Sequence, residues 1–246
     1  MPSKRTLVLL LGGVAGAVDA IGYVTLFHLF TANMTGNTVK AARGLTAHAW
    51  RALAWHGFPI AMFVLGAIVG AVVARFLRSR PLALGLEIVA LVVFALLASS
   101  RDFGELHWLT AAMPALAMGI QSVTVRRCGH ATVQTAFLSG VLVSFADALV
   151  SWMQSRRPSA AARARLVLGV WACYALGAVA GFTAHARWGA SATLLPICAL
   201  ALSMGISAGT AASGSSSRRR GPPRAPSASS RTPRPPRGDP RSTGAA

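Results

Sequence analysis

Asp19 is the first residue of this sequence whose type and position could do chemistry, because it lies inside an apolar stretch long enough to cross a membrane. A carboxylate within a membrane-spanning helix costs roughly 2.5–3.5 kcal/mol on insertion scales, so it normally faces a partner or a hydrated cavity. Gly12, Gly16 and Tyr23 share one helical face with Asp19, and glycines let another helix approach closely. Asp19 is therefore expected to bind a proton or cation, or to lock two helices together by hydrogen bonding.

The second candidate is the polar segment TANMTGN at residues 31–37. Asn33, Thr35 and Asn37 supply amide and hydroxyl groups, and Gly36 permits an irregular backbone turn. Non-helical backbone at membrane depth is tolerated only where it is buried in protein or lines a cavity. A re-entrant turn here would direct these polar groups at a small ligand. The alternative is an interfacial connection in which a residue of this segment caps a short helix.

Two further carboxylates lie within helix-like stretches. Asp147 could serve a binding site, or it could form a salt bridge with Arg126 or Arg127. Glu87 stands alone on a Leu/Val/Ala-rich helix about two turns from Arg80, and its long side chain is expected to reach toward the membrane interface. The histidines and cysteines form no metal-binding pattern, and there is no nucleotide-binding motif. No catalytic residue, metal or cofactor is therefore expected.

The elements that must position these residues are membrane-spanning helices. The chain has 246 residues, of which 54% are hydrophobic and only 12% charged, against about 25% charged in a typical soluble domain. Six apolar segments approach the roughly 20 residues that a span needs: residues 7–27, 54–75, 82–99, 107–125, 166–186 and 190–211. Residues 31–47 and 131–152 are helix-like but more polar. The sequence predicts an all-α, polytopic transmembrane bundle of six spans, or of eight if both polar segments also cross.

Basic residues indicate how the spans are oriented. With six spans, eleven Lys and Arg residues lie on the cytoplasmic side of the membrane domain and five on the other side. Both the six-span and the eight-span arrangement place both termini in the cytoplasm, which makes the chain a multi-pass protein of the inner cell membrane.

The net charge of +18 comes from short clusters and from the tail, not from one folded face, so no specific nucleic-acid partner is expected. Residues 1–211 form the predicted transmembrane domain. Residues 212–246 are rich in Arg, Ser and Pro, with nothing to bury, and are expected to be a disordered cytoplasmic tail beside the anionic leaflet.

The chain also repeats itself, with halves of about 1–105 and 106–211. TANMTGN resembles TAFLSGV at 135–141, and LGAIVGA at 65–71 matches LGAVAGF at 176–182. Three spans per half would leave the halves inverted in the membrane, each with a short polar segment. Inverted repeats of this kind are typical of secondary transporters with a binding site near the midplane. The alternative is an old duplication without a transport role.

Several motifs resemble those of the YoaK family, bacterial integral membrane proteins of unknown function. They are a Gly-x-x-Asp-Ala element at 16–20, a Phe-x-Ala-Asn-x-Thr-Gly-Asn element at 30–37 and a Met-Gly-x-Gln element at 118–121. The family's Thr-Gly-Thr element reads Ser-Gly-Val at 139–141, which removes one hydroxyl. The resemblance covers about residues 7–211 and implies a six-span membrane protein, without implying a substrate.

These observations favour a permease for a small molecule or an ion, working by alternating access of one half against the other. Its central site would combine Asp19 and residues 31–38 with the second-half residues Gln121 and Ser139, and Gln121 is expected to hydrogen-bond across the interface between halves. The expected partners are the lipid bilayer, the transported substrate and a second copy of the chain. The rival interpretation is a non-transporting scaffold or assembly factor, and the third is a membrane-embedded enzyme.

Overall fold

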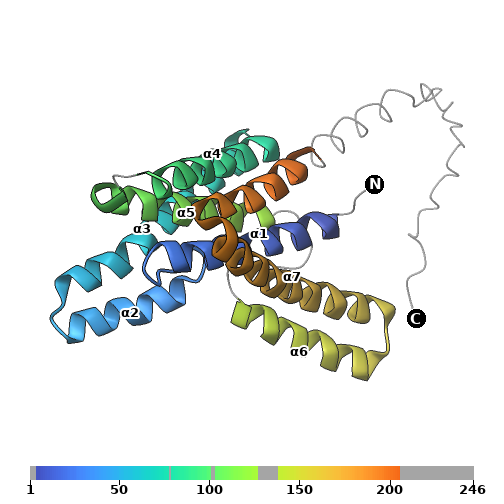
Figure 1. Cartoon of the computed structure of the whole chain (residues 1–246). Coiled ribbons are helices and arrows are strands. Elements are labelled where there is room, and N and C mark those ends of the chain that lie inside the picture. The colour runs from blue at the N-terminus through green and yellow to red at the C-terminus, as the bar shows by residue number, and fades with distance from the viewer. Residues whose placement is uncertain (1–3, 78, 101–102, 127–137, 206–246) are drawn as a thin grey trace, which may run out of the picture.

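All regular structure in the described part of the chain is helical, as predicted. The computed structural model describes residues 4–77, 79–100, 103–126 and 138–205. The helices are α1 (Lys4–Thr25), α2 (Met34–Thr46), α3 (Trp50–Val72) with a π-helical turn (Val73–Leu77), α4 (Arg80–Ala98), α5 (Phe103–Arg126), α6 (Leu138–Ser155) and α7 (Pro158–Trp188), followed by a 3-10 turn (Gly189–Thr193) (Figure 1). Residues 194–205 form a further helical segment. The predicted tail, 212–246, lies outside the described residues.

Four helical stretches are long and apolar enough to cross a membrane: Arg5–Thr25, Trp50–Leu77, Arg80–Ala98 and Pro158–Gly205. The last of these contains α7, the 3-10 turn and the helix at 194–205. Large apolar side chains such as Ile68 on α3 and Leu176 on α7 are exposed, which suits a surface that faces lipid. The predicted span at 107–125 coincides with α5, which is not among the four.

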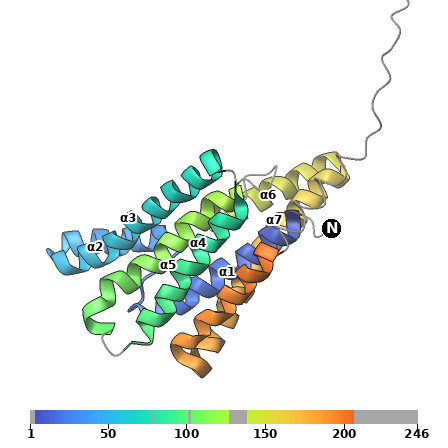
Figure 2. The same ribbon diagram turned by 90° about the horizontal axis from the view of Figure 1, so that it is seen from above.

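Two helix pairs form the centre of the bundle. Helix α1 lies along α7 and α3 lies along α5, with α4 beside α5 (Figures 1 and 2). Glycine makes both pairings close. A Cβ atom on Gly177 would lie 2.0 Å from the carbonyl oxygen of Gly13, and one on Gly66 would lie 2.1 Å from that of Leu116. The two backbones therefore touch directly in each pair.

The two pairings use the repeated sequence segments in the same way. Gly66 and Gly177 hold the same position in LGAIVGA and LGAVAGF, and each contacts a backbone carbonyl of the partner helix. The short helices follow the same scheme, since α2 packs on α3 and α6 packs on α7. The sequence similarity at 65–71 and 176–182 thus corresponds to equivalent contacts in the fold.

Helix α2 runs in the same direction as α1. The chain turns back after α1, so that residues 31 and 32 lie beside Asp19. It then runs forward again. This direction follows from the hydrogen bond of Lys40 on α2 to the carbonyl oxygen of His28, which lies just beyond the end of α1. The segment between α1 and α2 is therefore a re-entrant loop, and the two helices follow one another in series.

The largest buried cluster joins α1, α4, α5 and the helix at 194–205. Leu11, Leu91, Met118 and Leu200 contribute one side chain from each of these elements and are at most 1% exposed. The cluster includes residues of α4 and α5, which pack against each other, and Glu87 and Gln121 on these two helices are also buried.

Substitution of Gly177 by alanine is expected to lower the thermal stability of the purified protein, because the new methyl group would collide with the backbone of Gly13. Overpacking of this kind typically costs about 1–3 kcal/mol. Gly85→Ala on α4 is the matched control, since nothing lies within 4 Å of a Cβ atom there. Melting temperatures measured in detergent compare the two variants, and equal values would contradict the close α1–α7 contact.

Candidate functional site

The carboxylate of Asp19 is the centre of the candidate site. Its Oδ1 accepts hydrogen bonds from the backbone N–H of Thr31 and of Ala32, each at 2.7 Å, and from the Thr31 hydroxyl at 3.0 Å. Its Oδ2 accepts a hydrogen bond of 2.6 Å from the hydroxyl of Tyr174 on α7. Asp19 is 4% exposed. All four contacts come from donors, the surroundings that an acceptor-only carboxylate requires.

The loop at residues 26–33 is shaped so that it returns to Asp19. Helix α1 closes with a hydrogen bond of 2.8 Å from the His28 N–H to the Tyr23 carbonyl. Phe27 and His28 then adopt φ angles of 51° and 65°, a left-handed conformation that is uncommon for residues other than glycine. The flanking Leu26 and Leu29 are fully buried. These two apolar anchors fix the turn, which carries the following residues back along α1.

Asn37 holds the other end of the loop. Its amide donates to the Phe30 carbonyl at 2.7 Å and accepts from the Phe30 N–H at 3.1 Å, and the side chain is fully buried. Gly36 makes room for the Phe30 ring, whose carbons would lie 2.8 Å from an added Cβ atom. The polar segment therefore stabilises its own loop through these two residues.

Asn33 and Thr35 take less central positions. Asn33 occupies the N-cap position of α2 without forming a side-chain capping hydrogen bond, and Thr35 is exposed. The loop side chain that does reach the carboxylate is Thr31. Of the four site residues predicted in this segment, Asn37 is bound to the loop, Gly36 packs beneath it, and none contacts Asp19 through a described side-chain hydrogen bond.

Tyr174 and Lys40 were not singled out from the sequence. Tyr174 is one of only two tyrosines in the chain, and its place within an apolar run was the available signal. The ammonium group of Lys40 lies 5.2 Å from the ring centroid of Tyr23 and 5.0 Å from that of Phe30, a cation–π arrangement. Beside it is a cavity of about 420 Å³ whose polar lining is His28, Lys40, Arg43 and His56.

The predicted second-half residues do not join Asp19. Gln121 donates from its amide to the Leu11 carbonyl at 2.8 Å, so it does link α5 to α1 as expected, but two turns away from Asp19. Ser139 is exposed at the start of α6. Asp147 is also exposed and pairs with Arg163 of α7 at 3.9 Å. The side chains of the arginines at 126 and 127, its predicted partners, lie outside the described residues.

Glu87 does not extend to the membrane interface, and that prediction is wrong. The side chain is fully buried, and within the described residues neither carboxyl oxygen has a hydrogen-bond partner. The face of α4 that carries Glu87 also carries Leu84 and Leu91, which pack into the bundle. The helix therefore turns its carboxylate inward with its apolar core residues.

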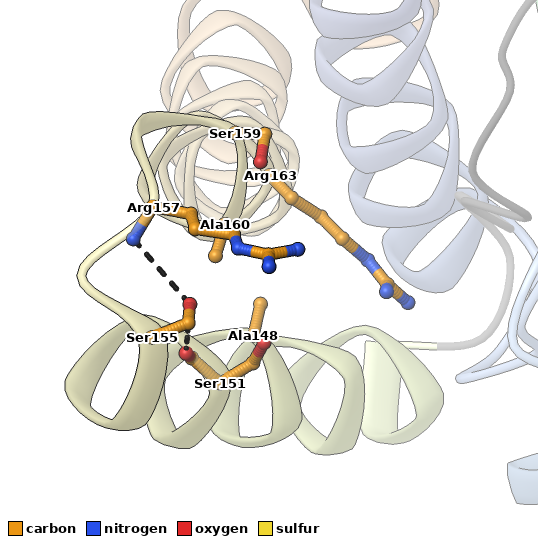
Figure 3. Close-up of a pocket in the computed structure, with 7 residues that line it drawn as sticks. All are labelled: Ala148, Ser151, Ser155, Arg157, Ser159, Ala160 and Arg163. Atoms are coloured by element: carbon orange, nitrogen blue, oxygen red, sulfur yellow. Dashed lines mark hydrogen bonds between the residues drawn. The ribbon is translucent and has the colours of Figure 1, made fainter.

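A second cavity lies in the α6–α7 hairpin and has a volume of about 340 Å³. Serine side chains of both helices line it, together with Arg157 of the connecting turn and Arg163 of α7 (Figure 3). Arginine and serine donors of this kind can hold an anionic group such as phosphate.

Apolar helices long enough to cross a membrane, together with a buried carboxylate at the crossing of α1 and α7, define a polytopic membrane protein. Comparison with known families gives its relationship. The chain belongs to the family described as protein of unknown function (DUF1275), whose profile matches residues 7–206. No solved structure matches the chain.

A curated relative supports the same assignment. The chain is 33% identical over 154 residues to the UPF0700 transmembrane protein YoaK of Bacillus subtilis (strain 168). The match covers 58% of this chain and 66% of YoaK, slightly less than two thirds of that protein's length. The resemblance inferred from the motifs at 16–20, 30–37 and 118–121 is thereby confirmed.

Replacing Asp19 by leucine is expected to destabilise the protein, because the N–H groups of Thr31 and Ala32 would lose their acceptor. Each buried group left unpaired costs about 1–3 kcal/mol. Asp19→Asn keeps one acceptor oxygen for both N–H groups and should fold nearly as well as the parent chain. Thermal unfolding in detergent tests this ranking. Equal stability of the Leu and Asn variants would show that the carboxylate does not hold the loop.

Proposed function

We propose that this chain is a permease for a small molecule or an ion, with Asp19 and the re-entrant loop as its binding site. The supporting observation is that one buried carboxylate binds both the loop after α1 and Tyr174 of α7. A charge within a membrane-spanning helix that links two separate elements is typical of substrate and ion pathways. Neither Ser139 nor Asp147, both exposed, belongs to the proposed site.

The proposed topology has six crossings, with both termini in the cytoplasm and the chain in the inner membrane. Helices α1 and α2 run in series and count as one interrupted crossing, and α5 with α6 would form the equivalent crossing in the second half. Helices α3, α4 and α7 and the helix at 194–205 supply the rest. Broken helices at matching positions of inverted halves are a feature of secondary transporters, where the break forms the binding site.

The contacts between the helix pairs suit an alternating-access mechanism. Helices α1 and α7 meet through Gly13, Gly16 and Gly177, where backbone lies on backbone, so few interlocked side chains oppose a small rotation. The hydrogen bond from Tyr174 to Asp19 adds a polar side-chain link at this contact. A substrate cation or donor group that replaced the tyrosine hydroxyl at Oδ2 would release α7 from α1.

One observation favours the rival class, a non-transporting scaffold. Asp19 is satisfied entirely by protein donors and is 4% exposed, as expected of a carboxylate that locks two helices together. The two functions differ in what Asp19→Asn would do. A scaffold tolerates this near-isosteric change, whereas a binding site that needs the charge does not.

Reporter fusions test the topology. Fusions after Arg80 and Arg157 are expected to report a cytoplasmic location, and a fusion after Arg101 an extracytoplasmic one, because α1 and α2 together cross once. If α2 and α6 each crossed separately, the results for Arg80 and Arg101 would be reversed while Arg157 stayed inside. Paired alkaline phosphatase and fluorescent-protein fusions give both readouts.

Uptake assays test the function. Cells that overproduce the chain should accumulate at least one compound from a radiolabelled metabolite panel faster than cells that lack it. Asp19→Asn should be well folded but impaired in that uptake, because the amide cannot carry the charge. Asp147→Asn, which alters an exposed carboxylate on α6, is the matched control and should transport normally. Full uptake by Asp19→Asn at every pH tested would exclude the proposed site.

A further inference from the structure

Glu87 is a second intramembrane carboxylate whose surroundings are the opposite of those of Asp19. It lies seven residues after Arg80 in α4, roughly 10 Å along the helix. The residue is 0% exposed. Both carboxyl oxygens are buried, and neither has a hydrogen-bond partner among the residues that the structure describes. Asp19, by contrast, accepts four hydrogen bonds.

The neighbours of Glu87 are apolar. Leu84 and Leu91 lie about one turn to either side of it on the same helical face. Both belong to the buried cluster that also contains Leu11 of α1 and Met118 of α5. The opposite face of α4 exposes Val89, Val92 and Leu96 and suits contact with lipid. Glu87 therefore points into the helix bundle, on the face of α4 that carries these buried leucines.

No described charge compensates Glu87. Of the elements packed against α4, the π-helical turn carries Arg75, which is exposed, and the 3-10 turn carries no charge. Arg5 on α1 is also exposed. Asp19 on α1 is bound to its own loop. His107 lies near the start of α5, stacked against Trp55, at the end of that helix remote from Gln121. The side chains of Lys4, Glu105 and Arg126 are not described.

Helix α5, which packs on α4, also carries a buried acceptor that lacks a donor within the described residues. Gln121 lies one turn beyond Met118 on α5 and is 1% exposed. Its amide nitrogen donates to the Leu11 carbonyl, whereas its amide oxygen has no hydrogen-bond partner within the described residues. An ionised Glu87 would add two more acceptors to the bundle interior, whereas a protonated Glu87 would add a donor.

We propose that Glu87 is a proton-binding site and that it carries the coupling proton of the permease. The coupling role, unlike the proton binding, rests on the proposed function. Binding converts the carboxylate and one proton into a neutral carboxylic acid, with no other bond made or broken. An ionised carboxylate without a partner is the least favourable occupant of an apolar interior. An alkali cation would need several oxygen ligands at once, whereas the described side chains that flank Glu87 on its face of α4, Leu84 and Leu91, are apolar.

The proton would leave when α4 of the first half separates from α5 of the second half and water reaches the carboxylate. Release and uptake of this proton would then accompany the same relative movement that opens and closes the Asp19 site. The two carboxylates thus take separate roles, with substrate bound at Asp19 and the proton bound at Glu87.

The test measures the proton directly, by infrared spectroscopy on the full chain in detergent. The sequence contains only two glutamates, Glu87 and Glu105, so labelling with glutamate that carries 13C at the side-chain carboxyl shifts the bands of these two residues alone. A Glu105→Gln variant then isolates Glu87 without altering it. We expect a protonated-carboxyl band at neutral pH that moves with the label and shifts in D₂O.

Absence of that band in the labelled Glu105→Gln protein at neutral pH would overturn the proposal, and so would its loss on addition of sodium or potassium ions. Glu87→Gln should abolish the band, whereas Asp19→Asn and Asp147→Asn should leave it unchanged. Because the labelling experiment keeps Glu87 intact, a folding defect in Glu87→Gln does not affect the conclusion.

Coupling is tested in liposomes with a compound found in the uptake panel. An imposed pH gradient should drive its accumulation by the parent chain. Glu87→Gln should lose this gradient-driven accumulation while retaining exchange of labelled for unlabelled compound, and gradient-driven accumulation by the variant would overturn the coupling role. If the infrared band is present but no compound is transported, the permease proposal fails and the proton-binding site stands.

Discussion

The fold depends on one requirement. Where a helix ends inside a membrane protein, the backbone N–H groups of the following residues must find acceptors within the protein. The loop at residues 26–33 meets it with Asp19, whose Oδ1 accepts from two consecutive N–H groups. This contact fixes where the chain turns and lets α2 start beside α1 and run in the same direction. The remaining oxygen, Oδ2, fixes α7 through Tyr174. One carboxylate thus sets the path of the first two helices and the position of a distant third.

The two intramembrane carboxylates show how differently the same chemical group can be used. Asp19 has a donor for each of its contacts and organises the structure around it. Glu87 has no hydrogen-bond donor among the described residues, so its carboxylate holds no other element in place. Leucines flank it on the same face of α4. The contrast separates a carboxylate that the fold requires from one that the fold merely accommodates.

Some of this arrangement was predictable from the sequence. The glycines one and two turns before Asp19 marked the face that packs against another helix, because helical periodicity is local. The segments at 65–71 and 176–182 were recognisable as equivalent for the same reason. The partner Tyr174 was not predictable, since it lies 155 residues away and no local pattern encodes a long-range pairing. The direction of Glu87 was missed because a helix that is apolar on every side does not reveal which side faces the protein.

The distance in sequence between Asp19 and its partners also orders events during synthesis. At roughly 5–20 residues per second, the ribosome reaches Tyr174, 155 residues downstream, roughly 8–30 s after Asp19. Thr31 follows Asp19 by only 12 residues and arrives within roughly 2 s at the same rates. Three of the four hydrogen bonds to the carboxylate can therefore form while α7 does not yet exist. The re-entrant loop can therefore shield the Asp19 carboxylate from lipid until the last helices are inserted.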